Sequence, residues 1–158
     1  MKTIDLNADV GELPEDRNVD AELMAWITSC NIACGAHAGD DATMRETLRL
    51  CRAHGVVVGA HPGYADREHF GRREQCLPYA ELVSLVREQV SLMDIRAREQ
   101  GLRLRHIKPH GALYNQSARD PDVAAAVAEA VHRHDPALLL VGMSGTRSIG
   151  AAEARGLR

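Results

Sequence analysis

The sequence has no long apolar run, no excess of positive charge and no apolar stretch at its N-terminus. No run approaches the roughly 20 apolar residues that a membrane-spanning helix needs, so we expect no membrane partner. Lys and Arg number 19 and Asp and Glu number 22, giving a formal net charge of −3. That balance offers no electrostatic case for binding nucleic acid. The start, MKTIDLNADVGE, turns acidic at once and lacks a secretory signal, so we expect a cytoplasmic protein.

Cysteine occurs in an even number, which by itself would allow disulfide pairing. The four cysteines are Cys30, Cys34, Cys51 and Cys76, and without an export signal we expect reduced thiols. Cys30, Cys34 and His37 can be interpreted as zinc ligands, but their spacing lacks the tight pairs of structural sites. Because Cys30 and Cys34 lie in an apolar run, we favour their burial as small hydrophobic residues.

A phosphate-binding loop is also missing. The sequence has no G-x-x-x-x-G-K-[ST] stretch, and GMSGTRS (142–148) lacks the P-loop lysine. If the reaction consumes ATP, the chain contains no familiar place to hold its phosphates.

Strand-like and helix-like segments alternate along the 158 residues, which we expect to form one domain, 1–158. The pattern predicts strands at 2–7, 27–34, 56–60, 104–107 and 138–142. Helices are predicted over 18–25, from 41 to Gly55, from Pro78 to Gly101, after Asp120, and over 145–155. This alternation indicates an α/β fold with a parallel sheet. The longest irregular stretch covers residues 61–77. A loop of this length inside a compact domain more often has a function than serves only as a connection.

Polar residues gather where four of the apolar runs end, in DLNADVGE (5–12), NIACGAHAGD (31–40), GAHPGY (59–64) and KPHGALYN (108–115). Proteins of the α/β class bind and react at the carboxyl ends of their strands. Asp5, Asn7 and Asp9 alternate and so share a face of the first strand. They can divide acid and base roles or hold a cation; the alternative is a solvated or helix-capping face. A first strand buried on both faces would make three polar residues costly, which favours function.

Three histidines, His37, His61 and His110, each follow a predicted strand. With Asp9 they can form a divalent-metal site that activates water, or they can carry protons or donate to a substrate carbonyl. Lys108 can stabilise an oxyanion or act as a base, unless it is an exposed residue before a turn. Arg72 and Arg73 can clamp a substrate carboxylate or lie solvated in the loop.

The strings DLNADVGE, SCNIACGAHAGD, VGAHPGYAD, FGRR and KPHGALYN together resemble the LamB/YcsF family, over about residues 4–115. The resemblance implies the A subunit of ATP-dependent 5-oxoprolinase, which cleaves 5-oxoproline to L-glutamate in complex with B and C subunits. It also implies a distorted (β/α) barrel of the deacetylase-like type. Fold relatives of that type often use an Asp/His metal site, so a divalent metal is possible here. ATP would then be a co-substrate held with the partner subunits.

On this resemblance we assign Asp9 or Asp5 to activating water, and Lys108 with His110 to stabilising the oxyanion. Arg72 would hold the carboxylate of 5-oxoproline. We also expect substrate contacts from four further residues: Asn7, His37, His61 and Asn115.

Two departures from the family pattern bear on these expectations. Ala8 stands where many members have Cys, and the chain stops where a further strand should begin, so we expect a C-terminally truncated barrel of about five strands. Two other functions stay open. One is a stand-alone metal-dependent, deacetylase-like amidohydrolase, and the other is a non-catalytic binding or regulatory subunit.

Overall fold

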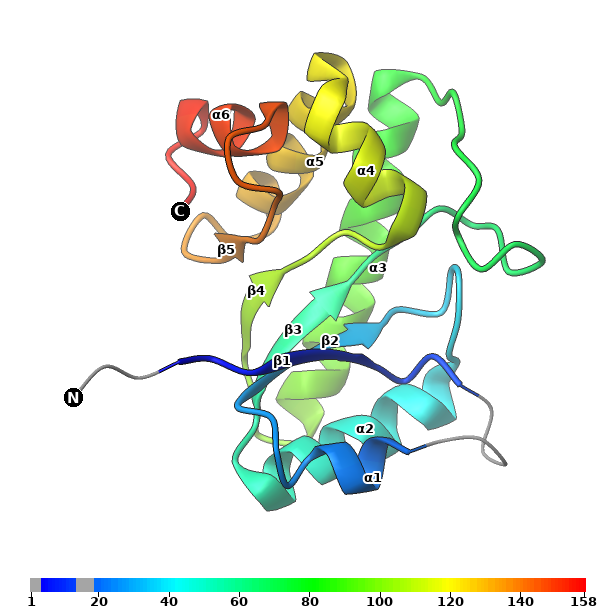
Figure 1. Ribbon diagram of the computed structural model, residues 1–158, viewed down its shortest axis with the longest axis vertical. Coiled ribbons are helices and arrows are strands. Elements are labelled where there is room, and N and C mark those ends of the chain that lie inside the picture. The colour runs from blue at the N-terminus through cyan, green and yellow to red at the C-terminus, as the bar shows by residue number, and fades with distance from the viewer. Residues whose placement is uncertain (1–3, 14–18) are drawn as a thin grey trace.

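Five parallel strands form one sheet at the centre of the computed structural model, which describes residues 4–13 and 19–158 (Figure 1). The strands lie in chain order, and their bounds are β1 Asn7–Val10, β2 Ser29–Ala33, β3 Val57–His61, β4 Leu104–Ile107 and β5 Leu139–Leu140. In the described residues the sheet is open, with β1 and β5 at its edges. The predicted α/β class with about five strands is confirmed.

Six helices are described: α1 Asp20–Leu23, α2 Asp41–His54, α3 Tyr79–Glu99, α4 Gly111–Arg119, α5 Pro121–His134 and α6 Arg147–Ala154. Figure 1 shows α2 and α3 lying along the sheet, while α4, α5 and α6 gather near β4 and β5. None of these helices is long and apolar enough to cross a membrane. The predicted start of the 18–25 helix, residue 18, lies outside the described residues, and α4 was not predicted as a separate helix.

Local capping explains where the predicted helices begin and end. The Asp40 side chain accepts a hydrogen bond from the Thr43 backbone amide at 2.8 Å, which starts α2. Gly55 follows the helix in the left-handed conformation, with φ of 70°. At α5 the Asp120 carboxylate accepts from the Asp122 and Val123 amides, ahead of the helix interior. Asp40, which closes a polar segment, is therefore a helix cap.

The first strand differs from its prediction in position and burial. It begins at Asn7 instead of ending there, and residues 2 and 3 of the predicted strand lie outside the described part. The expectation that β1 is buried on both faces is wrong, because Asn7 and Asp9 are exposed while Val10 is buried. The physical reason is that β1 lies at the edge of the sheet in the described residues, so its polar side chains keep access to water.

The sheet has one apolar and one polar face. The register places Val10 beside Ile32, and Cys30 beside Val58, on the face that contributes to the hydrophobic core with α2 and α3. Asn7 and Asp9 pair with Ser29 and Asn31 on the opposite face, and His106 of β4 pairs there with Gly59. The alternation of side chains along each strand therefore gathers polar residues of β1, β2 and β4 on one surface.

The burial predicted for Cys30 and Cys34 is confirmed. Cys30, Cys34 and Cys51 are buried free thiols, and Cys76 is an exposed one. The Cys30 sulfur lies 3.4 Å from that of Cys51 across the apolar face. Among the described residues no group that could hold a metal includes a cysteine, so the disfavoured site of Cys30, Cys34 and His37 is not assembled.

Candidate active site

Three histidines and one glutamate converge at the edge of the sheet where the strands end. They come from the carboxyl ends of β1, β2 and β3 and from the segment that follows β4. The ligand-capable atoms of Glu12, His37, His61 and His110 all lie within 4.8 Å of one another. Glu12 Oε1 lies 3.1 Å from His37 Nε2, 3.1 Å from His110 Nδ1 and 3.6 Å from His61 Nε2. The three rings are buried, and the Glu12 side chain is 16% exposed. We refer to these four residues as the histidine cluster.

Turns and strand ends bring the cluster together. Glu12 follows Gly11, whose φ of 71° turns the chain after β1. His37 lies in a tight turn in which the Gly35 amide donates to the Ala38 carbonyl at 2.9 Å. His61 is the last residue of β3, and His110 immediately precedes α4. Each ring therefore arrives from a different strand end.

Backbone carbonyls orient two of the rings. His61 Nδ1 lies 2.6 Å from the Lys108 carbonyl oxygen, and His110 Nε2 lies 2.8 Å from the Phe70 carbonyl oxygen. Phe70 has a φ of 56° and is the one non-glycine residue with positive φ in the described chain. This backbone conformation, uncommon for a bulky residue, is found in the loop that contacts the cluster.

Close packing fixes the rings further. His37 and His110 stack with centroids 3.8 Å apart and an interplanar angle of 2°. A Cβ on Gly71 would lie 2.8 Å from His37 Cβ, and one on Gly63 would lie 2.8 Å from His37 Nδ1. Both glycines thus let the 61–77 loop approach the stacked rings, which gives this predicted functional loop a defined structural task.

An ion pair lies next to the cluster. Lys108 Nζ is 2.7 Å from Asp9 Oδ1, Asn31 Nδ2 donates to the same oxygen at 2.7 Å, and His61 Nε2 lies 3.4 Å from Asp9 Oδ2. Burial tends to raise the pKa of Asp9, but the neighbouring His61 and Lys108 outweigh it and hold that pKa well below its ordinary value. Asp9 is therefore ionised at neutral pH.

The cluster itself contains a carboxylate and a neutral ring. Burial raises the pKa of Glu12, but the His110 and His37 rings beside it lower that pKa to about 2. Burial also lowers the pKa of His37, only partly opposed by its contact with Glu12. At neutral pH the site therefore holds an ionised glutamate beside an imidazole with a free nitrogen lone pair.

A polar network continues across the sheet beneath the ion pair. His106 Nε2 lies 2.7 Å from Asn31 Oδ1, and Asn31 Nδ2 donates to Asn7 Oδ1 at 2.5 Å. The His106 ring crosses above Gly59, where a Cβ would lie 2.1 Å from Nε2. This chain of contacts fixes the Asn31 amide that orients Asp9.

A cleft of about 520 Å³ opens onto the cluster through Glu12 and His37. It is also lined by Gly39, Arg67 and Phe70. The Arg67 guanidinium donates to the carbonyls of Gly35 and Gly39 at 2.8 and 2.7 Å, so it is anchored at the edge of the cleft. The space beside the cluster is large enough for a small organic substrate.

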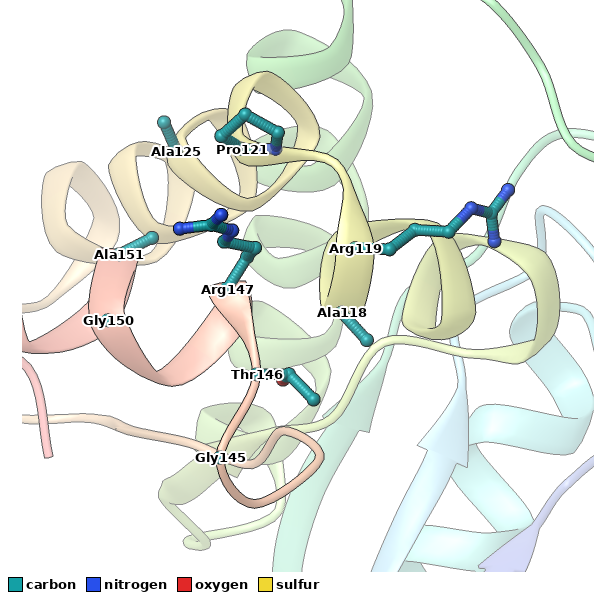
Figure 2. A pocket seen from close by; sticks show the side chains of 9 residues that line it. All are labelled: Ala118, Arg119, Pro121, Ala125, Gly145, Thr146, Arg147, Gly150 and Ala151. Carbon is teal, nitrogen blue, oxygen red and sulfur yellow. The ribbon is translucent and has the colours of Figure 1, made fainter.

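A larger cleft, of about 700 Å³, lies among α4, α5 and the start of α6 (Figure 2). Arg119 and Arg147 line it with small residues, and Figure 2 shows Arg119 pointing away from the other lining side chains. None of its lining residues belongs to the histidine cluster or to the ion pair. Chemistry is therefore assigned to the smaller cleft.

The structure brings together five of the nine predicted site residues: Asp9, His37, His61, Lys108 and His110. Asn7 belongs to the adjoining network through Asn31. Asp5 lies apart, with its carboxylate accepting from the Thr28 and Ser29 hydroxyls. Arg72 is exposed and lies over the Phe70 ring at 5.3 Å. Asn115 is exposed on α4.

Sequence reasoning missed Glu12, Asn31 and His106 as members of the site. Glu12 ends the polar string DLNADVGE, and its position after a turn-forming glycine was the available signal. Asn31 and His106 sit inside apolar strands, where a polar residue is unusual. That irregularity was a signal too.

A parallel sheet with imidazole, carboxylate and ammonium groups gathered beyond its strand ends is typical of α/β proteins that carry their active site at that edge. The model of the LamB/YcsF family matches residues 4–158, and the chain belongs to that family. The resemblance drawn from the sequence motifs is confirmed.

Curated relatives and a solved structure agree with this assignment. The chain is similar to the A subunits of 5-oxoprolinase from Staphylococcus carnosus (46% identity over 98% of this chain) and from Erwinia tasmaniensis (49% over 98%). Its fold is similar to that of a lactam utilization protein from Thermus thermophilus, with a TM-score of 0.96 and 43% identity over 99% of this chain. The chain spans 62% of the length of both curated relatives and 64% of that solved chain. The similarity to this solved structure is consistent with a distorted barrel fold.

Proposed function

We propose that the chain is a subunit of ATP-dependent 5-oxoprolinase that opens 5-oxoproline to L-glutamate. The observation that carries the proposal is the Asp9–Lys108 ion pair beside the histidine cluster, at the strand ends of a fold whose relatives are named as the A subunit of 5-oxoprolinase. B and C subunits are the proposed partners, and ATP hydrolysis to ADP and phosphate is the proposed coupled reaction.

The chemistry of a lactam explains what such a site must supply. The oxygen of water bonds to the ring carbonyl carbon, the ring C–N bond breaks, and the nitrogen takes a proton to become the amine of glutamate. A five-membered lactam is a stable amide, so phosphorylation of its carbonyl oxygen would assist the opening. Cleavage of the C–N bond would then leave an acyl phosphate, which a second water hydrolyses to the carboxylate and phosphate. As the first water adds and loses its proton, negative charge develops on its oxygen at the former carbonyl carbon, and an ammonium group held nearby stabilises that charge.

Lys108 is the cation that the site offers for this oxyanion. Asp9 holds the ammonium in place, and Asn31 and His61 hold Asp9. A carboxylate with a depressed pKa is a weak base. We therefore assign Asp9 to positioning Lys108, and assign the activation of water to the histidine cluster, which faces the cleft through Glu12.

The substrate carboxylate needs a cationic partner at the cleft. Arg67 lines the cleft directly, and Arg72 lies over Phe70, which lines it as well. We propose that Arg67 shares with Arg72 the binding of the 5-oxoproline carboxylate. Contacts of substrate with Asn7 and Asn115 stay predictions.

The test is release of glutamate from 5-oxoproline and ATP by the purified chain, with and without candidate B and C subunits. Because the chain has no P-loop lysine, we expect turnover only in the mixture, with one ADP formed per glutamate. A mixture whose glutamate release is unchanged when this chain is left out would contradict the proposal.

A metal-dependent, deacetylase-like amidohydrolase is the second candidate function, favoured by the convergence of three histidines and a glutamate. It predicts that added divalent metal speeds amide hydrolysis of an N-acetylated sugar without partner proteins. Tight binding of 5-oxoproline in calorimetry without turnover, even with partners, would instead indicate a non-catalytic binding role.

A further inference from the structure

The hydrogen bonds of His61 and His110 determine which ring nitrogens face the centre of the cluster. A carbonyl oxygen can only accept, so His61 Nδ1 and His110 Nε2 must each carry the hydrogen that they donate to the Lys108 and Phe70 carbonyls. In the neutral rings the other nitrogens, His61 Nε2 and His110 Nδ1, are then bare lone pairs. These two atoms lie only 3.0 Å apart.

A third acceptor faces the same point. The carboxylate oxygen Oε1 of Glu12 lies 3.1 Å from His110 Nδ1 and 3.6 Å from His61 Nε2. Three electron-rich atoms this close repel one another in a buried site. The arrangement requires a positive charge between them.

We propose that Glu12, His61 and His110 form a binding site for one divalent transition-metal ion of the zinc type. His37 is not included as a ligand, because its ring is stacked parallel on that of His110 and two parallel rings cannot both direct an in-plane lone pair at one ion. Zinc ligands lie about 2.0–2.1 Å from the metal, which separates the ligand atoms of a tetrahedron by about 3.3 Å. The three separations among the proposed ligand atoms are 3.0, 3.1 and 3.6 Å. Imidazole with carboxylate is a donor set that suits zinc, cobalt, nickel and iron.

The surroundings match those of metal-binding histidines. Such rings characteristically donate their second N–H to a backbone carbonyl or a carboxylate, as His61 and His110 both do. His37 departs from this pattern, because its Nδ1 atom is buried without a hydrogen-bond partner in the described structure. Phe70 turns its carbonyl toward His110 from the left-handed conformation.

A proton shared between His61 and His110 is the competing source of positive charge. The two cases differ in a measurable way, because a metal ion that occupies this site displaces the shared proton and binds at one ion per chain, whereas a site built only to share a proton shows no such binding. A bound metal would supply Lewis-acid activation of water, which is the task assigned above to this cluster. Metal binding itself is independent of the proposed function, so the site can be tested without turnover.

The experiment is calorimetric titration of the purified, chelator-treated chain with Zn²⁺, together with the visible spectrum of the chain after addition of Co²⁺. We expect one ion to bind per folded chain. We also expect the bound Co²⁺ to absorb strongly in the visible range, as cobalt of low coordination number does. Glu12→Gln and His110→Asn should each weaken binding by about 10- to 100-fold or more. His54→Ala is the matched control, because His54 is exposed at the end of α2 and lies outside the cluster.

Circular dichroism of each variant checks folding. Glu12 is the partly exposed member of the cluster, so Glu12→Gln should still fold if the histidine variant does not, and the test stays decisive. A folded wild-type chain that binds no ion stoichiometrically would overturn the proposal, as would equal losses in Glu12→Gln and His54→Ala. Stoichiometric binding without glutamate release would leave the metal site standing and count against the proposed function alone.

Discussion

Lys108 Nζ lies 2.7 Å from Asp9 Oδ1, although β2 and β3 separate β1 from β4 in the sheet. Neighbouring strands are about 4.8 Å apart, so three steps across a flat sheet would span about 14 Å. The contact therefore depends on the curl of the sheet as well as on the length of the lysine side chain. Curvature of the kind that a distorted barrel needs thus assembles the ion pair.

Replacing Lys108 by Met keeps the length of the side chain and removes its charge. We expect kcat for glutamate release in the reconstituted complex to fall by about 100-fold, because a developing oxyanion loses its cation. Arg103→Met removes an equal charge from an exposed position before β4 and should leave turnover close to that of the wild type. A Lys108→Met rate close to that of the wild type would rule out the oxyanion role.

Gly59→Ala should destabilise the fold, because the new Cβ would lie 2.1 Å from His106 Nε2 and displace the ring from Asn31. We expect the free energy of unfolding to fall by about 1–3 kcal/mol in urea titrations, the usual cost of overpacking. Gly150→Ala is the control, since an added Cβ there meets no atom within 4 Å. Equal stability of the two variants would mean that His106 does not need the space above Gly59.

Arg67 and Arg72 can be separated by their effects on substrate binding. If Arg67 binds the 5-oxoproline carboxylate, Arg67→Met should raise KM about tenfold or more, with a smaller change in kcat. Arg72→Met should raise KM less, because its guanidinium lies over Phe70 and not in the cleft lining. Arg73→Met, at an exposed neighbouring position, serves as the control. An unchanged KM in Arg67→Met would leave the carboxylate without the proposed partner.

His106 should make stability depend on pH. Burial lowers its pKa; Asp5 opposes this shift, whereas Lys108 and His61 reinforce it. The unfolded chain therefore takes up this proton first, so the contribution to stability is present above about pH 6.5 and is lost as the pH falls. Urea unfolding at about pH 7.5, 6 and 5 should show a shallower loss of stability in His106→Gln than in the wild type. Identical pH dependence in the two proteins would contradict the prediction.

Features fixed by neighbours in sequence were predictable. Asp40, Gly55 and Asp120 specify helix ends through contacts within a few residues, and the helix ends predicted at Gly55 and Asp120 were confirmed. The gathering of His37, His61 and His110 followed from the rule that parallel strands end at one edge. The α4 helix was harder to predict, because it begins at Gly111, a residue more typical of turns and helix ends.

Features fixed by register and by turns could not be predicted. The contact between His106 and Asn31 joins residues 75 positions apart and depends on the pairing of β3 with β2 and β4. Glu12 enters the cluster because Gly11 turns the chain, while Asp5, two residues before β1, bonds instead with Thr28 and Ser29. Alternation in the sequence predicted a shared face and could not determine which carboxylate reaches the histidines.

The most direct test of the account compares Asp9→Asn with Asp5→Asn in glutamate release from 5-oxoproline and ATP by the complex with B and C subunits. Asp9 holds Lys108 and contacts His61, whereas the Asp5 carboxylate accepts hydrogen bonds from the hydroxyl groups of Thr28 and Ser29, away from the cluster. The account predicts a loss of about 100-fold or more for Asp9→Asn and near-normal turnover for Asp5→Asn. Near-normal turnover by Asp9→Asn would contradict it.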